Sequence, residues 1–245
     1  MPTINPGRDA EFRFDNTSTW AVARDSSTAQ TVRTTATAAI PRASGANSLF
    51  DCYRYMAAFD TSGITGTVAT ATLKLYGYIY TTADLIVVKV SSSATGSPTT
   101  NFVAADFGRI DGFVAGSSMA GNVTDYSAEI PTWLVNQYNS ITLTSDALSD
   151  LSSLSTFRLA VVTYDYDYLN VAPGITTLRS GFRTVNVTTA ARRPVIDIQT
   201  VSWVYRQQTS QPSQVLQPQT SIRSMAFDTL LSTESMRYLV VWLES

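Results

Sequence analysis

The chain has 245 residues, of which 44% are hydrophobic and only 15% are charged. This composition supplies enough apolar side chains for a substantial core and argues against global disorder. The net charge is −2, and the 17 basic residues are scattered rather than clustered, which excludes the usual pattern of a nucleic-acid-binding protein. No run approaches 18 apolar residues, so we expect no membrane span and no membrane partner.

Cysteine content and the first residues bear on where the protein is made. Cys52 is the only cysteine, which excludes an intrachain disulfide, and its bulky neighbours favour packing over reactivity. The opening residues, MPTINPGRDAEFRF, lack the basic and apolar regions of a secretory signal. Ser and Thr supply much of the polarity, which is typical of β-rich proteins that face the environment. We therefore expect synthesis in a cytoplasm followed by exposure outside the cell.

Strand signals dominate the chain in order of sequence. The runs alternate between apolar and polar residues or are wholly apolar, and Gly, Pro, Ser and Asn clusters separate them. The run at 84–92 is nearly all apolar, as expected of a strand covered on both faces. Strands are predicted at 9–15, 18–26, 53–60, 68–80, 84–92, 139–145, 156–168, 176–182 and 192–205.

Two segments are predicted to be short helices. SAEIPTWLVNQY, residues 127–138, places Ile130, Leu134 and Tyr138 four residues apart, with Pro131 at an early position that a helix tolerates. SDALSDLSSL, residues 145–154, offers Ser145 as an N-cap ahead of Leu148. The strands and helices together predict an all-β fold, a jelly-roll-like antiparallel β-sandwich with one or two short helices.

The composition changes near residue 205. RQQTSQPSQVLQPQTS, residues 206–221, is rich in Gln, Ser and Pro, which predicts a linker or an extended arm. The chain then becomes apolar, and in a strand Tyr238, Val240 and Trp242 would share one face. Because a solvated segment of this kind would expose a large apolar surface, we expect it to dock, either on its own domain or on another subunit. The sequence thus predicts a sandwich domain at 1–204 and a C-terminal assembly arm at 205–245.

The middle of the chain resembles a known family. YRYMAAFDTSGITGTVATATLKLYGY is similar to the signature of DNRLRE-type domains, which are related to the CBM96-type carbohydrate-binding modules. TFRLAVVTYDYDYLNVAPGITTLRSG followed by RRPVIDIQT resembles the end of the family's domain, and the likeness covers roughly residues 6–200. The signature positions are Arg54, Phe59, Asp60, Ala71, Leu73, Leu75 and Tyr76.

This resemblance implies a fold and two functions. It implies a jelly-roll-like sandwich, found in secreted polysaccharide-associated proteins and in phage virion proteins. Together with the C-terminal arm, it predicts a non-enzymatic surface protein of a bacteriophage virion, in capsid decoration or in a tail or fibre. Such a protein would contact other virion proteins and form a homo-oligomer. The alternative is a carbohydrate-binding module that recognises cell-surface or matrix glycan, and a virion protein could also hold host glycan.

The stretch TYDYDYLN, residues 163–170, is the candidate site. Read as a strand, it projects Tyr164, Tyr166 and Tyr168 to one face, where they could stack on sugar rings. Asp165, Asp167 and Asn170 could instead bind calcium together with backbone carbonyls. The third reading is purely structural, a strand face or a subunit contact.

Catalytic chemistry has little support in the sequence. There is no histidine, which removes the commonest general base and the usual triad. Asp165 and Asp167 could in principle serve a glycosidase, but two positions apart in a strand they would simply share a face. We therefore predict a protein that is not an enzyme and needs no cofactor, with calcium left open.

Overall fold

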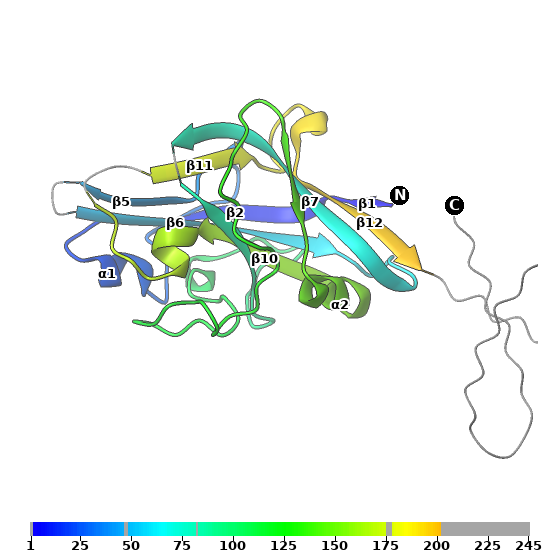
Figure 1. Ribbon diagram of the computed structural model, residues 1–245, viewed down its shortest axis with the longest axis horizontal. Helices are drawn as coiled ribbons and strands as arrows, with labels where there is room; N and C mark the ends of the chain where they lie inside the picture. The colour runs from blue at the N-terminus through cyan, green and yellow to red at the C-terminus, as the bar shows by residue number, and fades with distance from the viewer. Residues whose placement is uncertain (1, 47–48, 82, 175–177, 202–245) are drawn as a thin grey trace, which may run out of the picture. The chain divides into compact units, whose positions relative to one another are not determined.

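The computed structural model describes residues 2–46, 49–81, 83–174 and 178–201 (Figure 1). Contacts divide the chain into Met1–Val204 and Tyr205–Ser245, and the described residues all belong to the first unit. The predicted arm, including Tyr238, Val240 and Trp242, therefore lies outside the described residues. No helix in the described ranges is long and apolar enough to cross a membrane.

The first unit is an all-β antiparallel sandwich, which confirms the predicted fold class. Short helical turns interrupt the strands, and every pairing between the strands is antiparallel. In chain order the elements are β1 (Thr3–Ile4), β2 (Pro6–Thr17), α1 (Trp20–Arg24), β3 (Thr31–Arg33), β4 (Ala38–Ala39), β5 (Arg42–Ala46), β6 (Leu49–Asp60), β7 (Thr67–Thr81), β8 (Leu85–Lys89), η1 (Ala104–Asp106), β9 (Tyr138–Thr142), α2 (Ser145–Ser153), β10 (Thr156–Thr163), η2 (Tyr164–Tyr168), β11 (Leu178–Arg183), η3 (Ala190–Arg192) and β12 (Val195–Val201).

Two layers of strands make up the sandwich. One layer contains β2, β6, β10 and β8, with β3 at its edge beside β2. The other contains β1, β12, β7 and β9, and Figure 1 shows β7 lying beside β12. The first part of β7 pairs with β12 and β9, whereas its last residues pair with β11, which continues through β5 to β6. Because β7 takes part in both sets of pairings, the two layers form one continuous sheet.

The core between the layers follows the alternation of the strands. On β7, Leu73 and Leu75 point inward, and on β6 Tyr55, Ala57 and Phe59 do the same from the opposite layer. A side-chain period of two places every second residue on one face, so these runs could be assigned from the sequence. Thr72 and Lys74 lie on the outer face of β7, as predicted.

A second apolar cluster covers the other face of the β2–β6–β10–β8 layer. Met56 and Ala58 of β6 and Ile86 and Val88 of β8 point into it. Helix α1 and the long irregular segment between β8 and β9 pack on this face. They contribute Trp20, Ala23, Ala94, Phe102, Phe107, Ile110 and Met119. The prediction that strand 84–92 is covered on both faces is thus confirmed for β8.

The predicted helix at 127–138 is wrong, because this segment has no helix in the structure and β9 begins at Tyr138. Ile130 forms a bridge with Leu85, and Trp133 is inserted into the core, where its Nε1 donates to the Gly181 carbonyl at 3.0 Å. The Asn139 side chain accepts from the Leu134 N–H at 2.8 Å. Sheet contacts and the Asn139 side chain therefore take the place of helical hydrogen bonds.

Two other helical regions test the sequence analysis. The helix predicted at 145–154 is present as α2, although its N-cap is Thr144 rather than Ser145. The strand predicted at 18–26 is wrong, because Trp20–Arg24 forms helix α1. Thr19 caps this helix by accepting the Val22 N–H, and Trp20 and Ala23 then share one buried face. Local capping here outweighs the alternating pattern.

Candidate functional site

The stretch at 163–170 is a π-helical turn rather than a strand. Strand β10 ends at Thr163, whose side-chain oxygen accepts the Asp167 N–H at 3.3 Å. The Leu169 N–H then donates to the Tyr164 carbonyl at 3.0 Å, five residues back, and Asn170 adopts a positive φ of 58°. The threonine cap ends the strand, and the asparagine in the left-handed region ends the π-helical turn that follows. The prediction of alternating faces at Tyr164, Asp165, Tyr166, Asp167 and Tyr168 is therefore wrong.

The turn does not present the three tyrosines as one row. Tyr164 and Tyr168 stack on each other, with ring centroids 5.2 Å apart and an interplanar angle of 18°. Tyr168 is buried, and its hydroxyl donates to Asp125 at 2.8 Å. Tyr166 is half-buried at the middle of the turn. Tyr164 and Tyr168 thus each cover one ring face of the other, and sugar stacking at the three tyrosines stays a prediction.

Asp167 binds two buried arginines beneath the turn. Its carboxylate accepts two hydrogen bonds from Arg54, at 2.7 Å from Nε and 2.8 Å from Nη2, and lies 3.4 Å from Nε of Arg24. All three side chains are at most 1% exposed. Burial alone lowers the pKa of Arg54, but attraction and hydrogen bonds from Asp167 outweigh burial and leave that pKa raised. Arg54 therefore stays charged, and its contact with the carboxylate is bidentate.

The remaining guanidinium donors bind backbone carbonyls. Arg54 donates to the carbonyls of Phe107 and Arg24 at 2.8 and 2.9 Å. Arg24 donates to the carbonyls of Asp167 and Ser117 at 2.7 and 2.9 Å. These bonds connect β6, α1, η2 and the segment between β8 and β9. With the bond from Arg24 to Asp25, the two guanidiniums donate seven hydrogen bonds among the described residues, which makes this cluster a structural cross-link.

Cys52 lies on the same face of β6 and behaves as a packing residue. Its side chain is fully buried. Burial raises the pKa of the thiol well above its ordinary value, and the nearby charge of Asp167 raises it further. Because the thiolate is the reactive form, a thiol held neutral in this way is a poor nucleophile.

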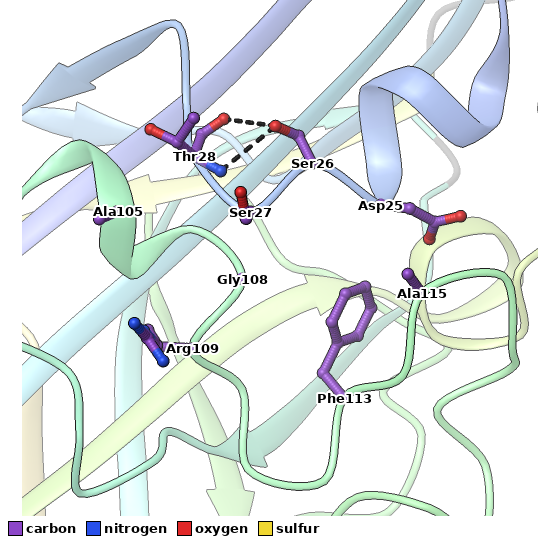
Figure 2. Close-up of a pocket in the computed structure, with 9 residues that line it drawn as sticks. All are labelled: Asp25, Ser26, Ser27, Thr28, Ala105, Gly108, Arg109, Phe113 and Ala115. Atoms are coloured by element: carbon purple, nitrogen blue, oxygen red, sulfur yellow. Dashed lines mark hydrogen bonds between the residues drawn. The ribbon is translucent and has the colours of Figure 1, made fainter.

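A pocket of about 390 Å³ opens above this cluster, between residues 25–28 and residues 105–115 (Figure 2). Asp25 forms one wall and is held in place, since Oδ1 accepts from Arg24 at 2.6 Å and Oδ2 accepts from the Gly116 N–H at 2.9 Å. The Phe113 ring lies 5.1 and 4.8 Å from the guanidinium carbons of Arg24 and Arg54. The buried charges thus hold two walls of the pocket.

The opposite side of the pocket carries polar groups that are available for a ligand. Within the described part of the chain, the side chains of Ser27, Thr28 and Arg109 make no hydrogen bond or ion pair, and all three are exposed. Gly108 lies close to the segment 25–28, because a Cβ on Gly108 would lie 3.3 Å from the Ser27 Cα. A cation, two hydroxyls and the half-buried Phe113 ring around one hollow can bind a polar ligand that also has an apolar face.

The three predicted calcium ligands have different surroundings. Asp167 faces the arginines, whereas the amide of Asn170 donates to the Gly116 carbonyl at 3.0 Å. Asp165 lies near Asp84 and Glu129. Among the described residues, no group of three or more acidic, Cys or His side chains is arranged to hold a metal ion. The structure does not bring the predicted set together, and calcium binding stays a prediction.

The sequence analysis missed Arg24, Asp25, Arg109 and Phe113. One signal for the buried cluster was present, because Arg54 shares the face of Cys52 and Met56 on β6. A cation at an inward position of a buried strand requires a carboxylate partner. The sequence does not show which carboxylate pairs with Arg54, because the contact joins residues 54 and 167, which are far apart along the chain.

Comparisons with known proteins add no family. No protein-family model matches the chain, and no curated protein matches it. The resemblance to DNRLRE-type domains therefore rests on the residues quoted for it.

Proposed function

We propose that this chain is a non-enzymatic structural protein of a bacteriophage virion surface, in capsid decoration or in a tail or fibre. The observation that carries the proposal is the unbroken apolar run at 238–243 behind a linker rich in Gln, Ser and Pro. A segment of this composition lowers its free energy by docking on another surface. Asp167 supports a structural role, because its carboxylate is held by two arginines instead of being available as an acid or base.

Removal of the arm tests this function. Deleting residues 210–245 leaves the described sandwich residues intact, so the truncated protein keeps its β-rich circular dichroism and its unfolding transition. Its incorporation into phage particles, measured by quantitative immunoblotting of purified virions, falls to background. Trp242→Ala in the full chain is the matched point variant and lowers incorporation in part. Normal incorporation of the truncated protein would refute the proposal.

A second candidate function is glycan binding, and the pocket of Figure 2 favours it. Phe113 offers an apolar ring face, while Arg109, Ser27 and Thr28 offer groups that bind hydroxyl or carboxylate oxygens. The volume of about 390 Å³ suits one or two sugar units rather than a long polymer. This site differs from the tyrosine stretch predicted from the sequence.

A glycan array with three variants separates the two sites. If the pocket binds glycan, Phe113→Ala and Arg109→Ala each weaken binding at least about tenfold, which corresponds to ~1.4 kcal/mol. Tyr166→Ala serves as the matched variant for the tyrosine turn and leaves pocket binding unchanged. Loss of binding in Tyr166→Ala alone would move the site to the turn. Unchanged binding in all three variants, or no glycan bound by the wild type, removes this candidate.

A further inference from the structure

Cations without a carboxylate partner are concentrated in one part of the sandwich. In the described residues, ion pairs with carboxylates involve Arg13, Arg24, Arg33, Arg42, Arg54, Lys74 and Lys89. The other described cations are Arg8, Arg109, Arg158 and the four arginines at 179, 183, 192 and 193. These last four lie in β11 or between β11 and β12, so this part of the surface carries an uncompensated positive charge.

Two of these arginines stack on tyrosines of β7. The guanidinium carbon of Arg183 lies 4.1 Å from the Tyr78 ring centroid, and that of Arg192 lies 5.1 Å from the Tyr76 ring centroid. Tyr76 and Tyr78 are two positions apart in β7 and share its outer face. Tyr78 is 42% exposed. We call Tyr76, Tyr78, Arg183 and Arg192 the basic face.

The basic face is held in position by its neighbours. The Tyr138 hydroxyl donates to the carbonyls of Ala191 and Arg193 at 2.8 and 3.0 Å, which fixes η3 beside β9. The Tyr138 ring meets Tyr76 edge-on, with centroids 5.4 Å apart. Among the described side chains, the Nε of Arg183 is a buried donor with no acceptor. Stacked guanidiniums with unused donors are partly ordered before binding, which lowers the entropy cost of an ion pair.

A complementary acidic surface exists on the same chain. Asp84, Glu129 and Asp165, which we call the acidic cluster, make no ion pair with any cation in the described ranges. The Tyr164 N–H donates to the Asp84 carbonyl at 2.8 Å and Leu85 forms a bridge with Ile130, which brings the three acidic residues together. Partial desolvation and repulsion between these carboxylates raise the pKa of Asp84 and of Glu129. The cluster therefore gains from any cation that approaches it.

We propose that the basic face of one copy of this chain packs against the acidic cluster of a second copy. Charge complementarity between two surfaces of one sequence favours a second copy as the occupant, since no other partner is needed to explain both. Tyrosine and arginine are the residues that contribute most at protein interfaces. The inference rests on the proposed structural function and gives that function a contact within the sandwich, separate from the C-terminal arm.

Sedimentation velocity of the full chain at two salt concentrations provides the first test. The wild type associates at about 0.05 M NaCl and shifts toward the monomer at about 0.5 M, where the Debye length falls to roughly 4 Å. Arg183→Glu with Arg192→Glu weakens association at low salt at least about tenfold, as does Glu129→Lys with Asp165→Lys. Arg8→Glu is the control, because Arg8 is a described cation away from the basic face.

Mixing the two double variants gives the decisive result. Each variant lacks one working surface, but the reversed charges of one variant complement those of the other. Equal amounts mixed at low salt therefore form hetero-oligomers, which a fluorescent label on one variant detects. Failure of the mixture to associate, or wild-type association in either variant alone, overturns the proposal. So does a wild type that stays monomeric at low salt up to about 1 mM.

The outcomes separate this inference from the function of the arm. If both double variants keep wild-type association and are still incorporated into particles, the sandwich contact is wrong while the arm proposal stands. If the truncated chain still associates in a salt-dependent way and is incorporated into particles without the arm, the sandwich contact stands while the arm proposal is wrong. The thermal unfolding midpoint of each variant checks that it is folded. If the acidic-cluster double variant does not fold, the single exposed substitution Glu129→Lys is used to measure the loss of association instead.

Discussion

Single charged residues in the interior determine how the irregular parts of this sandwich are fixed. Asp167 and its two arginines connect a strand, a helix, a turn and a long loop through hydrogen bonds. Asp9 connects another set, since its carboxylate accepts from the Tyr55 hydroxyl at 3.0 Å and the Val185 N–H at 2.8 Å. Both carboxylates are buried, but of the two only Asp167 has arginines beside it.

Replacing Asp167 tests the cross-link. Asp167→Ala leaves the buried Arg54 guanidinium without its counter-charge and leaves Arg24 with Asp25 as its carboxylate partner, so the free energy of unfolding falls by about 3–5 kcal/mol. Asp165→Ala, two positions away and partly exposed, changes it by less than about 0.5 kcal/mol. Urea unfolding followed by circular dichroism measures both variants. Equal midpoints for the two would show that the cluster contributes little to stability.

Asp9 makes the stability of the sandwich depend on pH. Burial is the main cause that raises the pKa of Asp9 to about 6, whereas hydrogen bonds from Val185 and Tyr55 act in the opposite direction. Because the pKa is higher in the folded than in the unfolded state, its stabilising contribution is present at low pH and is lost as the pH rises through about 6.

The wild type therefore gains about 1 kcal/mol of stability from Asp9 when the pH falls from 7.5 to 5. Asp9→Asn does not titrate and lacks this gain. Chemical denaturation of both proteins at the two pH values measures the difference, and subtraction removes the contributions of other groups with raised pKa values, such as Asp84. The same pH dependence in both proteins would contradict the assignment.

Elements with strong alternation were predicted well from the sequence, and elements set by distant contacts were not. Strands β6, β7, β8 and β12 have apolar residues at every second position or throughout, and each lies where the pattern predicts. Residues 127–138 carry apolar residues at helical spacing, yet Trp133 enters the core and the backbone runs along β7. The sequence predicted a strand at η2 because five residues alternate there. The Thr163 cap and the positive φ of Asn170 favour a turn instead.

Gly77 shows how closely the segment before β9 approaches β7. A Cβ at Gly77 would lie 1.9 Å from the Leu134 carbonyl oxygen, which is backbone and cannot rotate away. Gly77→Ala therefore displaces residues 134–137 and lowers the free energy of unfolding by about 1–3 kcal/mol. Trp133 in the same segment supplies the readout, because its fluorescence shifts when its ring leaves the core.

Gly63 provides the matched control for this prediction. It lies in the turn between β6 and β7, and a Cβ there would meet nothing within 4 Å. Gly63→Ala thus leaves both the unfolding midpoint and the Trp133 emission close to those of the wild type. A Gly77→Ala protein with unchanged emission would mean that the segment adapts without moving Trp133.

At the scale of the whole described unit, one layer of strands is covered on both faces. The sandwich core covers one face of β2, β6, β10 and β8, and a layer almost without regular structure covers the other. The sequence indicated two-sided burial only at β8, through its apolar run. The candidate pocket was not predicted, since it lies between residues 25–28 and the 105–115 segment and depends on contacts between residues far apart in the sequence.

The pairing of β1 with β12 has a consequence for how the polypeptide can be rearranged. The Ile198 N–H donates to the Pro2 carbonyl at 3.0 Å, so the first and last described strands of the sandwich are neighbours. A short peptide can therefore join these two strands, and the chain can be reopened at the exposed turn around Gly63 with little loss of native contacts. In such a circular permutant the joining peptide replaces residues 202–245, and fused cargo is carried at the β6–β7 turn, which lines a small pocket together with Pro2 and Thr200.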